Sequence, residues 1–406
     1  MRKVGVIGGG FVGLNVAVLA ALRGLEVVVV DVKREVVEAI NENRPLVRDK
    51  FVEENWPHVK GRLRATTDYA ELSNVSRIVV AVNTPVKVQG RELVKMLENE
   101  EGSLDDYINF RPLEEAGRRL GEVVREGLVS SEVTIYPFGT LRRLVAPFVS
   151  VAGSSVAEKV SFVHSPERIN PEDPVWTVAT INRVVGAMDE ESLREGVKFY
   201  KEELGVPVAK ATSMREAELS KLMENAQRFL NVAYVSAVRA AAGLTDIDFY
   251  EALEASATKP FSFFHFRPGY VGGPCLGKDT LMLYLWMRES NVSNNVSRLL
   301  RQALIANEYY LIFLSLRIAE LARRRGAKKL LMNGLGYKPG SRNFVGEDVN
   351  PPWRLKRELE SLGLEVKAFD PHMPERSDFR SGEEARAWAD LVIGWGREGD
   401  VRLERV

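Results

Sequence analysis

The chain has 406 residues, more than a single hydrophobic core ordinarily accommodates, so we expect two or three domains. Hydrophobic residues make up 45% and charged residues 28%, which is typical of a folded globular protein and excludes a disordered or fibrous one. Lys+Arg and Asp+Glu both number 56, so no overall positive charge exists to bind nucleic acid or anionic lipid.

The cysteine and histidine content excludes several kinds of site. The only cysteine, Cys275, cannot form an intrachain disulfide or a cysteine-based metal site, and the four histidines are too scattered for a structural metal. The N-terminus enters directly into a strand-like run without a signal-peptide pattern, and no apolar stretch is long enough to cross a membrane. We therefore expect a cytoplasmic protein without bound metal.

The N-terminal part alternates between strand and helix patterns. Residues 3–8 and 25–30 are continuous apolar runs, which suit a parallel sheet buried on both faces, and 11–23 between them has helical spacing. Further strands are predicted over residues 76–82 and 129–136. This alternation predicts a doubly wound α/β domain of the Rossmann type over residues 1–190.

The remaining chain predicts two more domains. Long helices over residues 215–242 and 296–325, with a Gly- and Pro-rich loop over 265–277, indicate a central helical domain over 191–300. Residues 301–406 repeat the opening pattern and predict a second, smaller Rossmann-like domain. Its predicted elements are strand 328–333, turn 334–336, helix 352–362 and strands 364–369 and 389–395.

A dinucleotide-binding pattern opens the chain. Residues 8–13 read GGGFVG, which fits G-x-G-x-x-G with Gly8, Gly10 and Gly13 between a strand and a helix. Gly8 permits the tight turn, Gly10 lets a pyrophosphate approach, and Gly13 lets helix pack on strand. Asp31 ends the next strand, where it would accept hydrogen bonds from a ribose and repel a 2′-phosphate, so NAD is favoured over NADP.

The glycine-rich segment around Cys275 is the most informative part of the sequence. A lone cysteine is usually a small buried hydrophobic residue. Here four glycines and two prolines within residues 266–279 remove the bulky neighbours that would bury it, and they expose backbone N–H groups that stabilise a thiolate or an oxyanion. Lys278 and Asp279 follow within one turn, so we interpret Cys275 as a nucleophile.

Five segments in the same order resemble the UDP-glucose/UDP-N-acetylmannosamine (GDP-mannose) dehydrogenase family over nearly the whole chain. VNTP (82–85) is similar to the family's V-P-T-P, EVTIYP (132–137) is similar to its E-S-T-V-x-P, and SPERINP (165–171) is similar to its S-P-E-R. The helix with Glu218, Lys221 and Asn225 resembles the family's E-x-x-K-x-x-x-N. Residues 268–279 resemble its cysteine loop. Within this loop Tyr270 stands where a second Gly or Pro is common.

The chain also departs from the family pattern. Phe138 stands where a glycine is expected, and Ser236-Ala237 replaces the usual Asn-Glu of the long helix. Residues 339–351 lack the motif D-x-R-x-S-P, for which Arg342 is the nearest substitute. The missing motif bears on substrate contacts from the C-terminal domain.

The resemblance implies a two-step oxidation of the C6 alcohol of a UDP-sugar, with two NAD consumed and a cysteine thioester as intermediate. Its implied catalytic residues are Cys275, Lys221, Asn225, Asp279, Glu167 and Thr134. Its implied cofactor-binding residues are Gly8, Gly10, Phe11, Val12, Gly13, Asp31, Thr84, Pro85, Thr134 and Lys278. Its implied substrate-binding residues are Glu167, Arg168, Ile169, Asn170, Lys221, Asn225, Arg228, Tyr270, Gly272 and Lys338.

The segment after Glu167 favours one branch of the family. UDP-glucose enzymes usually read P-E-F-L-R-E, whereas this chain reads P-E-R-I-N-P, like the enzymes that act on UDP-N-acetylhexosamines. We therefore expect a UDP-N-acetylhexosamine as substrate, with mannosamine the leading epimer, and UDP-glucose as the alternative. A simple alcohol dehydrogenase that uses the Lys–Asn pair, and a sensor that binds NAD and a UDP-sugar without turnover, remain open. The family also implies a homodimer formed through the central helix.

Overall fold

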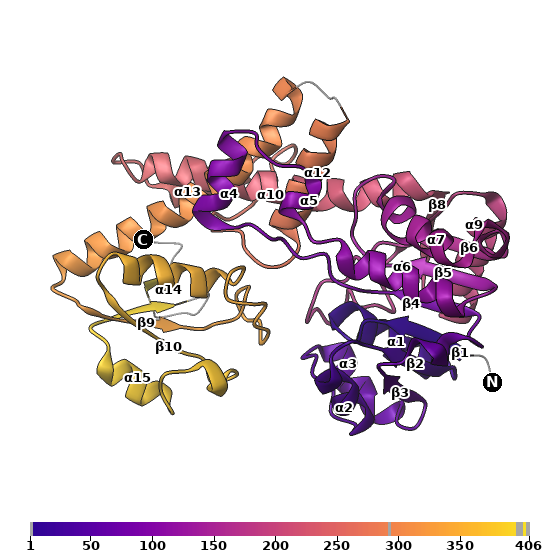
Figure 1. Ribbon diagram of the computed structural model, residues 1–406. Helices are drawn as coiled ribbons and strands as arrows, with labels where there is room; N and C mark the ends of the chain where they lie inside the picture. Colours follow the sequence, from indigo (N-terminus) through magenta and orange to yellow (C-terminus); the bar gives the residue numbers. More distant parts are fainter. Residues whose placement is uncertain (1–2, 291–293, 395–400, 403–406) are drawn as a thin grey trace. The chain divides into compact units, whose positions relative to one another are not determined.

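The computed structural model describes residues 3–290, 294–394 and 401–402 and contains two compact units (Figure 1). The first unit comprises residues 1–87 and 104–224, and the second comprises residues 88–103 and 225–406. Helix α10 (Met214–Ala242) belongs to both, because the division falls within it at residue 224. The mixed α/β class predicted from the sequence is confirmed.

The first unit is built on one eight-stranded sheet with the order β3-β2-β1-β4-β5-β6-β7-β8. The first five strands are parallel and have the order of a Rossmann domain, whereas β7 runs antiparallel to β6. The strands are β1 (Lys3–Ile7), β2 (Glu26–Val30), β3 (Leu63–Thr66), β4 (Arg77–Val80), β5 (Gly127–Ser131), β6 (Val160–His164), β7 (Arg183–Ala187) and β8 (Val208–Ser213).

Helices cover this sheet. Helix α1 is apolar on nearly all sides and buries every residue from Gly13 to Ala21 in a core shared with α9 and β6, as expected for a helix enclosed by its own domain. Helices α6 and α7 pack on each other and bury Leu113 and Phe148. The longer helices of this unit are α1 (Phe11–Leu22), α2 (Arg34–Asn41), α3 (Lys50–Asn55), α6 (Arg111–Val123), α7 (Ala146–Ala152) and α9 (Glu190–Lys198).

The predicted strand over residues 129–136 was too long. Strand β5 ends at Ser131, where it pairs with Val80 of β4 and His164 of β6, the last residues of those strands. The Glu132 N–H still donates to the Val80 oxygen at 2.9 Å, but β4 and β6 themselves end at Val80 and His164, and Pro137 lacks the donor that a longer strand would need. Residues 133–137 therefore leave the sheet at its carboxyl edge, where ligands bind in such folds.

The second unit contains long helices and a small parallel sheet with the order β10-β9-β11-β12. Helices α13 and α14 contribute to one core with β9, and α15 packs with Phe369 and Leu331 in a separate cluster (Figure 1). Its elements are α4 (Gly90–Glu98), α11 (Phe249–Ala257), α12 (Leu276–Glu289), α13 (Asn294–Arg324), β9 (Lys329–Asn333), α14 (Pro351–Ser361), β10 (Glu365–Phe369), α15 (Gly382–Trp388), β11 (Leu391–Gly394) and β12 (Val401–Arg402). The predicted strand 389–395 matches β11, and its last residue lies outside the described residues.

The predicted repeat of the opening fold is present down to its hydrogen bonds. In the first unit, the N–H groups of Gly9 and Lys33 donate to the two carboxylate oxygens of Asp31, at 2.7 and 2.9 Å. In the second unit, the N–H groups of Leu335 and His372 donate to the two carboxylate oxygens of Asp370 in the same way, at 2.8 and 2.9 Å. The repeat differs after the turn, because residues 337–350 form a loop before α14 begins. None of the described helices is apolar over the length that a membrane span requires.

Phe138, where the family pattern has a glycine, adopts the left-handed backbone conformation with φ +67°. Its side chain is 42% exposed and lies beside Arg215, whose guanidinium carbon is 5.8 Å from the ring centroid. This conformation is sterically unfavourable for any residue with a Cβ atom. The position therefore retains the backbone geometry that explains the family's glycine.

We predict that Phe138→Gly makes the protein more stable than Phe138→Ala by about 1 kcal/mol. Both variants lose the ring, but only glycine relieves the strain at φ +67°. Urea unfolding of the two variants checks this. A glycine variant no more stable than the alanine variant would show that the strain is absent.

Candidate active site

The glycine turn of the first unit has the close packing that the sequence predicts. A Cβ atom on Gly13 would lie 1.8 Å from the carbonyl oxygen of Gly8, so only glycine allows α1 to pack against the turn. Gly8 itself has φ +98°, and its added Cβ would meet the Ala81 oxygen at 2.6 Å. By contrast, no atom lies within 4 Å of a Cβ added to Gly10, so this position leaves space above the turn.

The N-terminus of α1 can accept an anionic group. Gly10 is its N-cap without a side-chain cap, and the first turn holds no acidic residue. The unpaired N–H groups and the helix dipole therefore favour a phosphate. Phe11 and Val12 lie in this first turn, and Asp31 keeps acceptor capacity beyond its two backbone hydrogen bonds. This arrangement fits NAD.

The predicted cofactor residues gather at the carboxyl edge of the sheet. Thr84 and Pro85 follow β4, and Thr134 follows β5, the neighbouring strand. The structure brings two of them into contact, because the Thr84 hydroxyl lies 3.4 Å from the Thr134 carbonyl oxygen. Thr84 is buried and Pro85 is exposed.

The loop after β6 carries the next group of predicted residues. Glu167 is half-buried, and its carboxylate accepts a hydrogen bond from the N–H of Ile169. Asn170 is exposed and donates to Asp173 at 2.7 Å. Arg168 forms a two-point ion pair with Glu224 of α10, at 2.7 and 3.1 Å. The loop is therefore tied to the helix that carries Lys221.

A fully buried ion pair supports this edge of the sheet, and sequence reasoning missed it. Arg183 at the start of β7 donates to Glu132 at 2.9 Å, and the Tyr200 hydroxyl donates to the same carboxylate at 2.9 Å. Glu132 directly follows β5, two residues before Thr134. A sequence signal existed, because Glu132 begins the EVTIYP segment, but its partner cannot be chosen without the fold.

A second buried polar cluster lies where α10 begins. The carboxylate of Glu218 accepts hydrogen bonds from the N–H groups of Phe138 and Thr140, at 2.6 and 2.7 Å. Burial raises the pKa of Glu218 to about 7, although these hydrogen bonds act in the opposite direction. The Thr140 hydroxyl also lies 3.1 Å from His164 Nδ1, and burial lowers the pKa of His164 to about 3.

In the second unit, Cys275 is exposed and is the N-cap residue of α12. A thiol at a helix N-terminus is favoured as the thiolate, because the dipole and the free N–H groups stabilise negative charge. The alternative of a buried structural cysteine is thus not met. Gly277 lies in the first turn of α12 beside Phe229 of α10. A Cβ atom added to Gly277 would lie 3.8 Å from the Phe229 ring, an ordinary contact distance.

Asp279 is fully buried one turn after Cys275. One carboxylate oxygen accepts from Asn225 Nδ2 at 2.5 Å, and the other pairs with Lys278 Nζ at 2.6 Å. The structure therefore brings together two predicted catalytic residues, Asn225 of α10 and Asp279 of α12. Arg228, which follows Asn225 by about one turn of α10, is exposed.

Two side chains, Ser236 of α10 and Asn307 of α13, hold the backbone of the cysteine loop. The Ser236 hydroxyl lies 3.0 Å from the Gly269 nitrogen and 3.2 Å from its oxygen. The Asn307 amide bonds both backbone groups of Val271, at 2.8 and 3.0 Å. These contacts explain how Ser236, a departure from the family pattern, still supports the loop.

Tyr270 lies at the centre of a buried network. Its hydroxyl donates to Glu308 at 3.0 Å, and Arg354 pairs with Glu308 at 2.8 Å while lying over the tyrosine ring. Burial and the Glu308 carboxylate raise the pKa of Tyr270 well above its ordinary value. Gly272 approaches the Val349 carbonyl so closely that an added Cβ would lie 2.6 Å away. These contacts order the loop from within the protein.

The segment that lacks D-x-R-x-S-P still begins α14 in a well-capped manner. Asn350 is fully buried, accepts from the Trp353 N–H at 3.1 Å and donates to the Leu335 oxygen at 2.9 Å. Pro351 follows at the first helical position. Lys338 and Arg342 are half-buried in the preceding loop.

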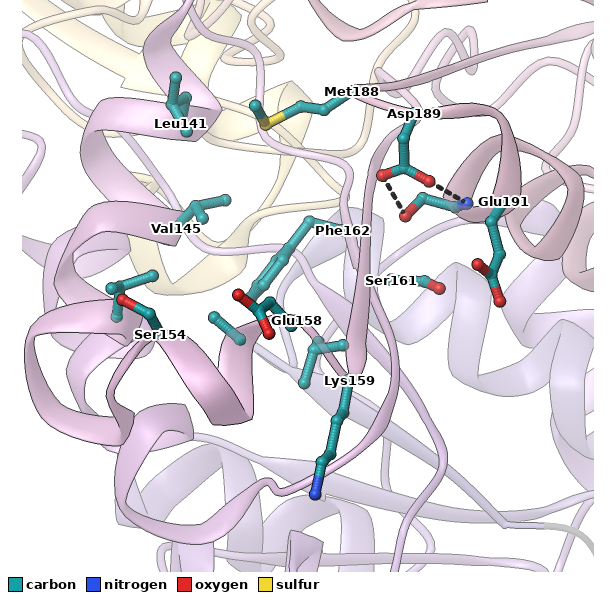
Figure 2. Close-up of a pocket in the computed structure, with 14 residues that line it drawn as sticks. Leu141, Val145, Ser154, Glu158, Lys159, Ser161, Phe162, Met188, Asp189 and Glu191 are labelled. Carbon is teal, nitrogen blue, oxygen red and sulfur yellow. Dashed lines mark hydrogen bonds between the residues drawn. The ribbon is translucent and has the colours of Figure 1, made fainter.

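A separate hollow in the first unit is lined by Leu141, Val145 and Phe162, with Glu158, Lys159 and Asp189 at its polar side (Figure 2). It contains no residue that the sequence predicts for the site. It lies by the amino end of β6, opposite the carboxyl edge where cofactors bind in such sheets. The Asp189 carboxylate accepts hydrogen bonds from the backbone N–H and the hydroxyl of Ser192, both at 2.8 Å, and thereby caps the N-terminus of α9 (Figure 2).

The chain has a dinucleotide turn at the edge of a parallel sheet, a long helix after it, and an exposed thiol at a helix N-terminus. Together with the NAD-binding domain matched below, these features define an NAD-dependent oxidoreductase. Residues 2–204 match the NAD-binding domain, and residues 215–309 the central domain, of the UDP-glucose/GDP-mannose dehydrogenase family. The chain belongs to this family, as the sequence motifs indicated.

Similar proteins span most of the chain. Protein CapL of Staphylococcus aureus is 30% identical, and the UDP-N-acetyl-D-glucosamine 6-dehydrogenase of Pseudomonas aeruginosa is 29% identical, each over 91% of this chain and 82% of its own length. The solved structure of the UDP-D-ManNAc dehydrogenase of Pyrococcus horikoshii is similar with a TM-score of 0.81 and 26% identity, over 97% of this chain and 89% of that one.

The closely packed Gly13 and the open Gly10 make a matched test of the turn. We predict that Gly13→Ala destabilises the protein by about 2 kcal/mol or more, because its Cβ collides with the Gly8 carbonyl. Gly10→Ala has space for its Cβ and should unfold like the wild type, yet bind NAD at least about tenfold more weakly, because the methyl group blocks the pyrophosphate. Urea unfolding and fluorescence titration with NAD check both. Equal loss of stability in the two variants would contradict the assignment of Gly13 to helix packing and of Gly10 to pyrophosphate binding.

Glu218 and His164 give opposite contributions to the pH dependence of stability. In the folded protein Glu218 keeps its proton up to about pH 7, whereas in the unfolded chain it loses the proton near pH 4.5. The contribution of Glu218 to the free energy of unfolding therefore falls as pH rises through this window. His164 stays neutral down to about pH 3 when folded, whereas the unfolded chain takes up a proton below 6.5, so its contribution falls as pH decreases.

We predict that Glu218→Gln removes the first contribution, worth about 3 kcal/mol between pH 4.5 and 7, and leaves that of His164. The free energy of unfolding of this variant should then rise with pH between 5 and 6.5 more steeply than that of the wild type. Urea unfolding at several pH values measures it. Parallel pH curves for the two proteins would rule out a raised pKa at Glu218.

Proposed function

We propose that this protein oxidises the C6 alcohol of a UDP-N-acetylhexosamine to the carboxylate, with UDP-N-acetyl-D-mannosamine as the leading substrate. The observation that carries the proposal is the exposed Cys275 at the N-terminus of α12, with Asp279 and Asn225 hydrogen-bonded to each other one turn further on. A relative that acts on UDP-D-ManNAc and another that acts on UDP-N-acetyl-D-glucosamine support the substrate class.

NAD, when bound at the Gly8–Gly13 turn, supplies the acceptor for one hydride in each of two oxidations. The residues of the chain do the remaining work. In the first oxidation the C6 hydroxyl gives up a proton while its carbon gives up a hydride, and the product is an aldehyde. Lys221 and Asn225, four residues apart on one face of α10, stabilise the developing oxyanion.

Cys275 makes the second oxidation possible. Its thiolate adds to the aldehyde carbon, the oxyanion takes up a proton, and the resulting thiohemiacetal loses a proton and a second hydride to give a thioester. Water then attacks the thioester carbon, the C–S bond breaks, and the thiolate is restored. We assign Glu167 to proton transfer in this hydrolysis and Thr134 to ordering the water. We assign Asp279 to holding Asn225 and Lys278 in place.

The remaining assignments concern recognition. We propose Arg168, Ile169, Asn170, Arg228, Tyr270, Gly272 and Lys338 as substrate-binding residues, and Lys278 as a cofactor contact. Tyr270 would act through the backbone of its loop, because its hydroxyl is bonded within the protein. A single cysteine without an intrachain disulfide fits a reducing compartment, so we propose the cytoplasm as the location.

One assay tests the proposal. NADH formation is followed by absorbance with UDP-N-acetyl-D-mannosamine, UDP-N-acetyl-D-glucosamine and UDP-glucose, and the acid product is quantified. We expect two NADH per acid and the highest kcat/KM with UDP-N-acetyl-D-mannosamine. One NADH per substrate would indicate a simple alcohol dehydrogenase. Calorimetric binding without NADH formation would indicate a sensor.

We predict that Cys275→Ala abolishes release of the acid, by about a thousandfold or more, because no thioester can form. Cys275→Ser should hold an aldehyde or a slowly hydrolysed ester. Thermal unfolding should change little in either variant, because the side chain is exposed. Wild-type rates of acid formation in the alanine variant would exclude the thioester mechanism.

We further propose that the protein is a homodimer formed through α10. Met223, Tyr234 and Val238 are 59%, 64% and 42% exposed, and at 100° per residue they lie within one narrow stripe of the helix. Lys221 and Asn225 lie on the opposite side, so a partner on this stripe leaves them accessible. An exposed apolar stripe of this kind is typical of an interface.

We predict that Tyr234→Glu splits the dimer and lowers its thermal stability, because it places a charge in an apolar interface. Light scattering at micromolar concentration measures the mass. A control is Leu244→Glu, which changes an apolar residue beyond the end of α10 that is 80% exposed, against 64% for Tyr234. A monomeric wild-type protein would refute the proposal.

A further inference from the structure

The guanidinium of Arg168 is engaged on three of its nitrogens. Nη2 and Nε bind the two carboxylate oxygens of Glu224, at 2.7 and 3.1 Å, and Nη1 donates to the Asn182 carbonyl at 2.9 Å. Such a planar two-point pair is the most directional ion pair that proteins form. The side chain thus has a well-defined position within the protein.

Glu224 lies one helical turn after Lys221 on α10. A carboxylate and an ammonium group three residues apart on a helix attract each other. Nevertheless, Lys221 forms no ion pair within the described part of the chain, although it is 91% buried. Glu224 is instead bound to Arg168.

The acidic residue one turn before Lys221 is also occupied. Glu218 accepts hydrogen bonds from Phe138 and Thr140, so its carboxylate points to the segment that follows β5. Both carboxylates that flank Lys221 on its own helix are therefore held by other partners. The Lys221 ammonium is left for a ligand oxygen.

We propose that Arg168 is a positioning residue: by binding Glu224 it keeps this carboxylate from the Lys221 ammonium and holds the Glu167 loop on α10. The inference rests on the proposed dehydrogenase function and deepens it. It gives Arg168 a role through Lys221, in addition to any contact with the sugar. Without Arg168, Glu224 pairs with Lys221 and the oxyanion loses its cation.

The kinetic test uses Arg168→Gln, Glu224→Gln and the double variant, with UDP-N-acetyl-D-mannosamine and UDP-glucose as probes. We expect Arg168→Gln to lower kcat about tenfold, in addition to any rise in KM from a lost sugar contact, and Glu224→Gln to lower kcat less. The double variant should recover to within about threefold of the wild type, because the competing carboxylate is gone. A double variant as slow as Arg168→Gln, or a rise in KM alone, would overturn the proposal in favour of direct substrate contact.

A second measurement does not depend on turnover. Lysines are reductively methylated with ¹³C-formaldehyde, and the Lys221 signal is identified by its absence in Lys221→Arg. We expect its titration midpoint to rise in Arg168→Gln, because Glu224 then stabilises the ammonium form, and to return in the double variant. An unchanged midpoint in Arg168→Gln would overturn the proposal even if all variants are active. Failure of the wild type to form NADH would overturn the proposed function alone.

Arg77→Gln is the matched control. Arg77 pairs with Glu195 at 2.9 Å and with Glu203 at 3.1 Å. The side chains of Arg77 and Glu195 are 16% and 36% exposed, close to the 24% and 38% of Arg168 and Glu224. Arg77 lies at the amino end of β4, away from the carboxyl edge that carries the predicted site. We expect this variant to lose stability like Arg168→Gln while kcat and the Lys221 midpoint stay as in the wild type. A matching loss of kcat in the control would show that Arg168 acts only through stability.

Discussion

The buried carboxylate of Glu218 is the contact on which the arrangement of the first unit depends. It accepts two backbone hydrogen bonds from residues 138 and 140, and thereby joins the start of α10 to the segment that leaves β5. A buried carboxylate without these donors would be strongly destabilising, so the helix cannot rotate or slide without losing them. Lys221 is one turn further along, and its direction is therefore set by a residue that takes no part in the chemistry.

The same principle applies to the cysteine loop. Its glycines allow the backbone to approach Val349 and Tyr337 closely, but they also make the loop costly to order. Hydrogen bonds from Ser236 and Asn307 to backbone groups, together with the buried Tyr270–Glu308–Arg354 network, offset this entropy. Cys275 thus gains a defined place at the N-terminus of α12 while its sulfur stays exposed.

Charged residues near the proposed site divide into two kinds. Arg183 and Glu132 form a fully buried pair with Tyr200, and Glu308 and Arg354 form a largely buried pair with Tyr270, so these residues serve mainly to fix the backbone around them. Lys221, Cys275 and Glu167 carry the proposed chemistry instead. Two of the residues in segments that depart from the family pattern, Ser236 and Asn350, make hydrogen bonds that support their segments.

The sequence by itself determined the order of elements and indicated the candidate residues for the chemistry. Glycine spacing, apolar runs and the isolated cysteine depend on local steric and hydrophobic rules that act within a few residues, so β1, α1, β2, α10 and the loop at 265–277 could all be predicted. Only the tertiary structure decided where β5 ends, which acid Arg183 and Arg168 bind, and that Tyr270 is buried. These outcomes depend on which distant residues meet at a sheet edge or a helix face, and one-dimensional patterns do not record such long-range pairing.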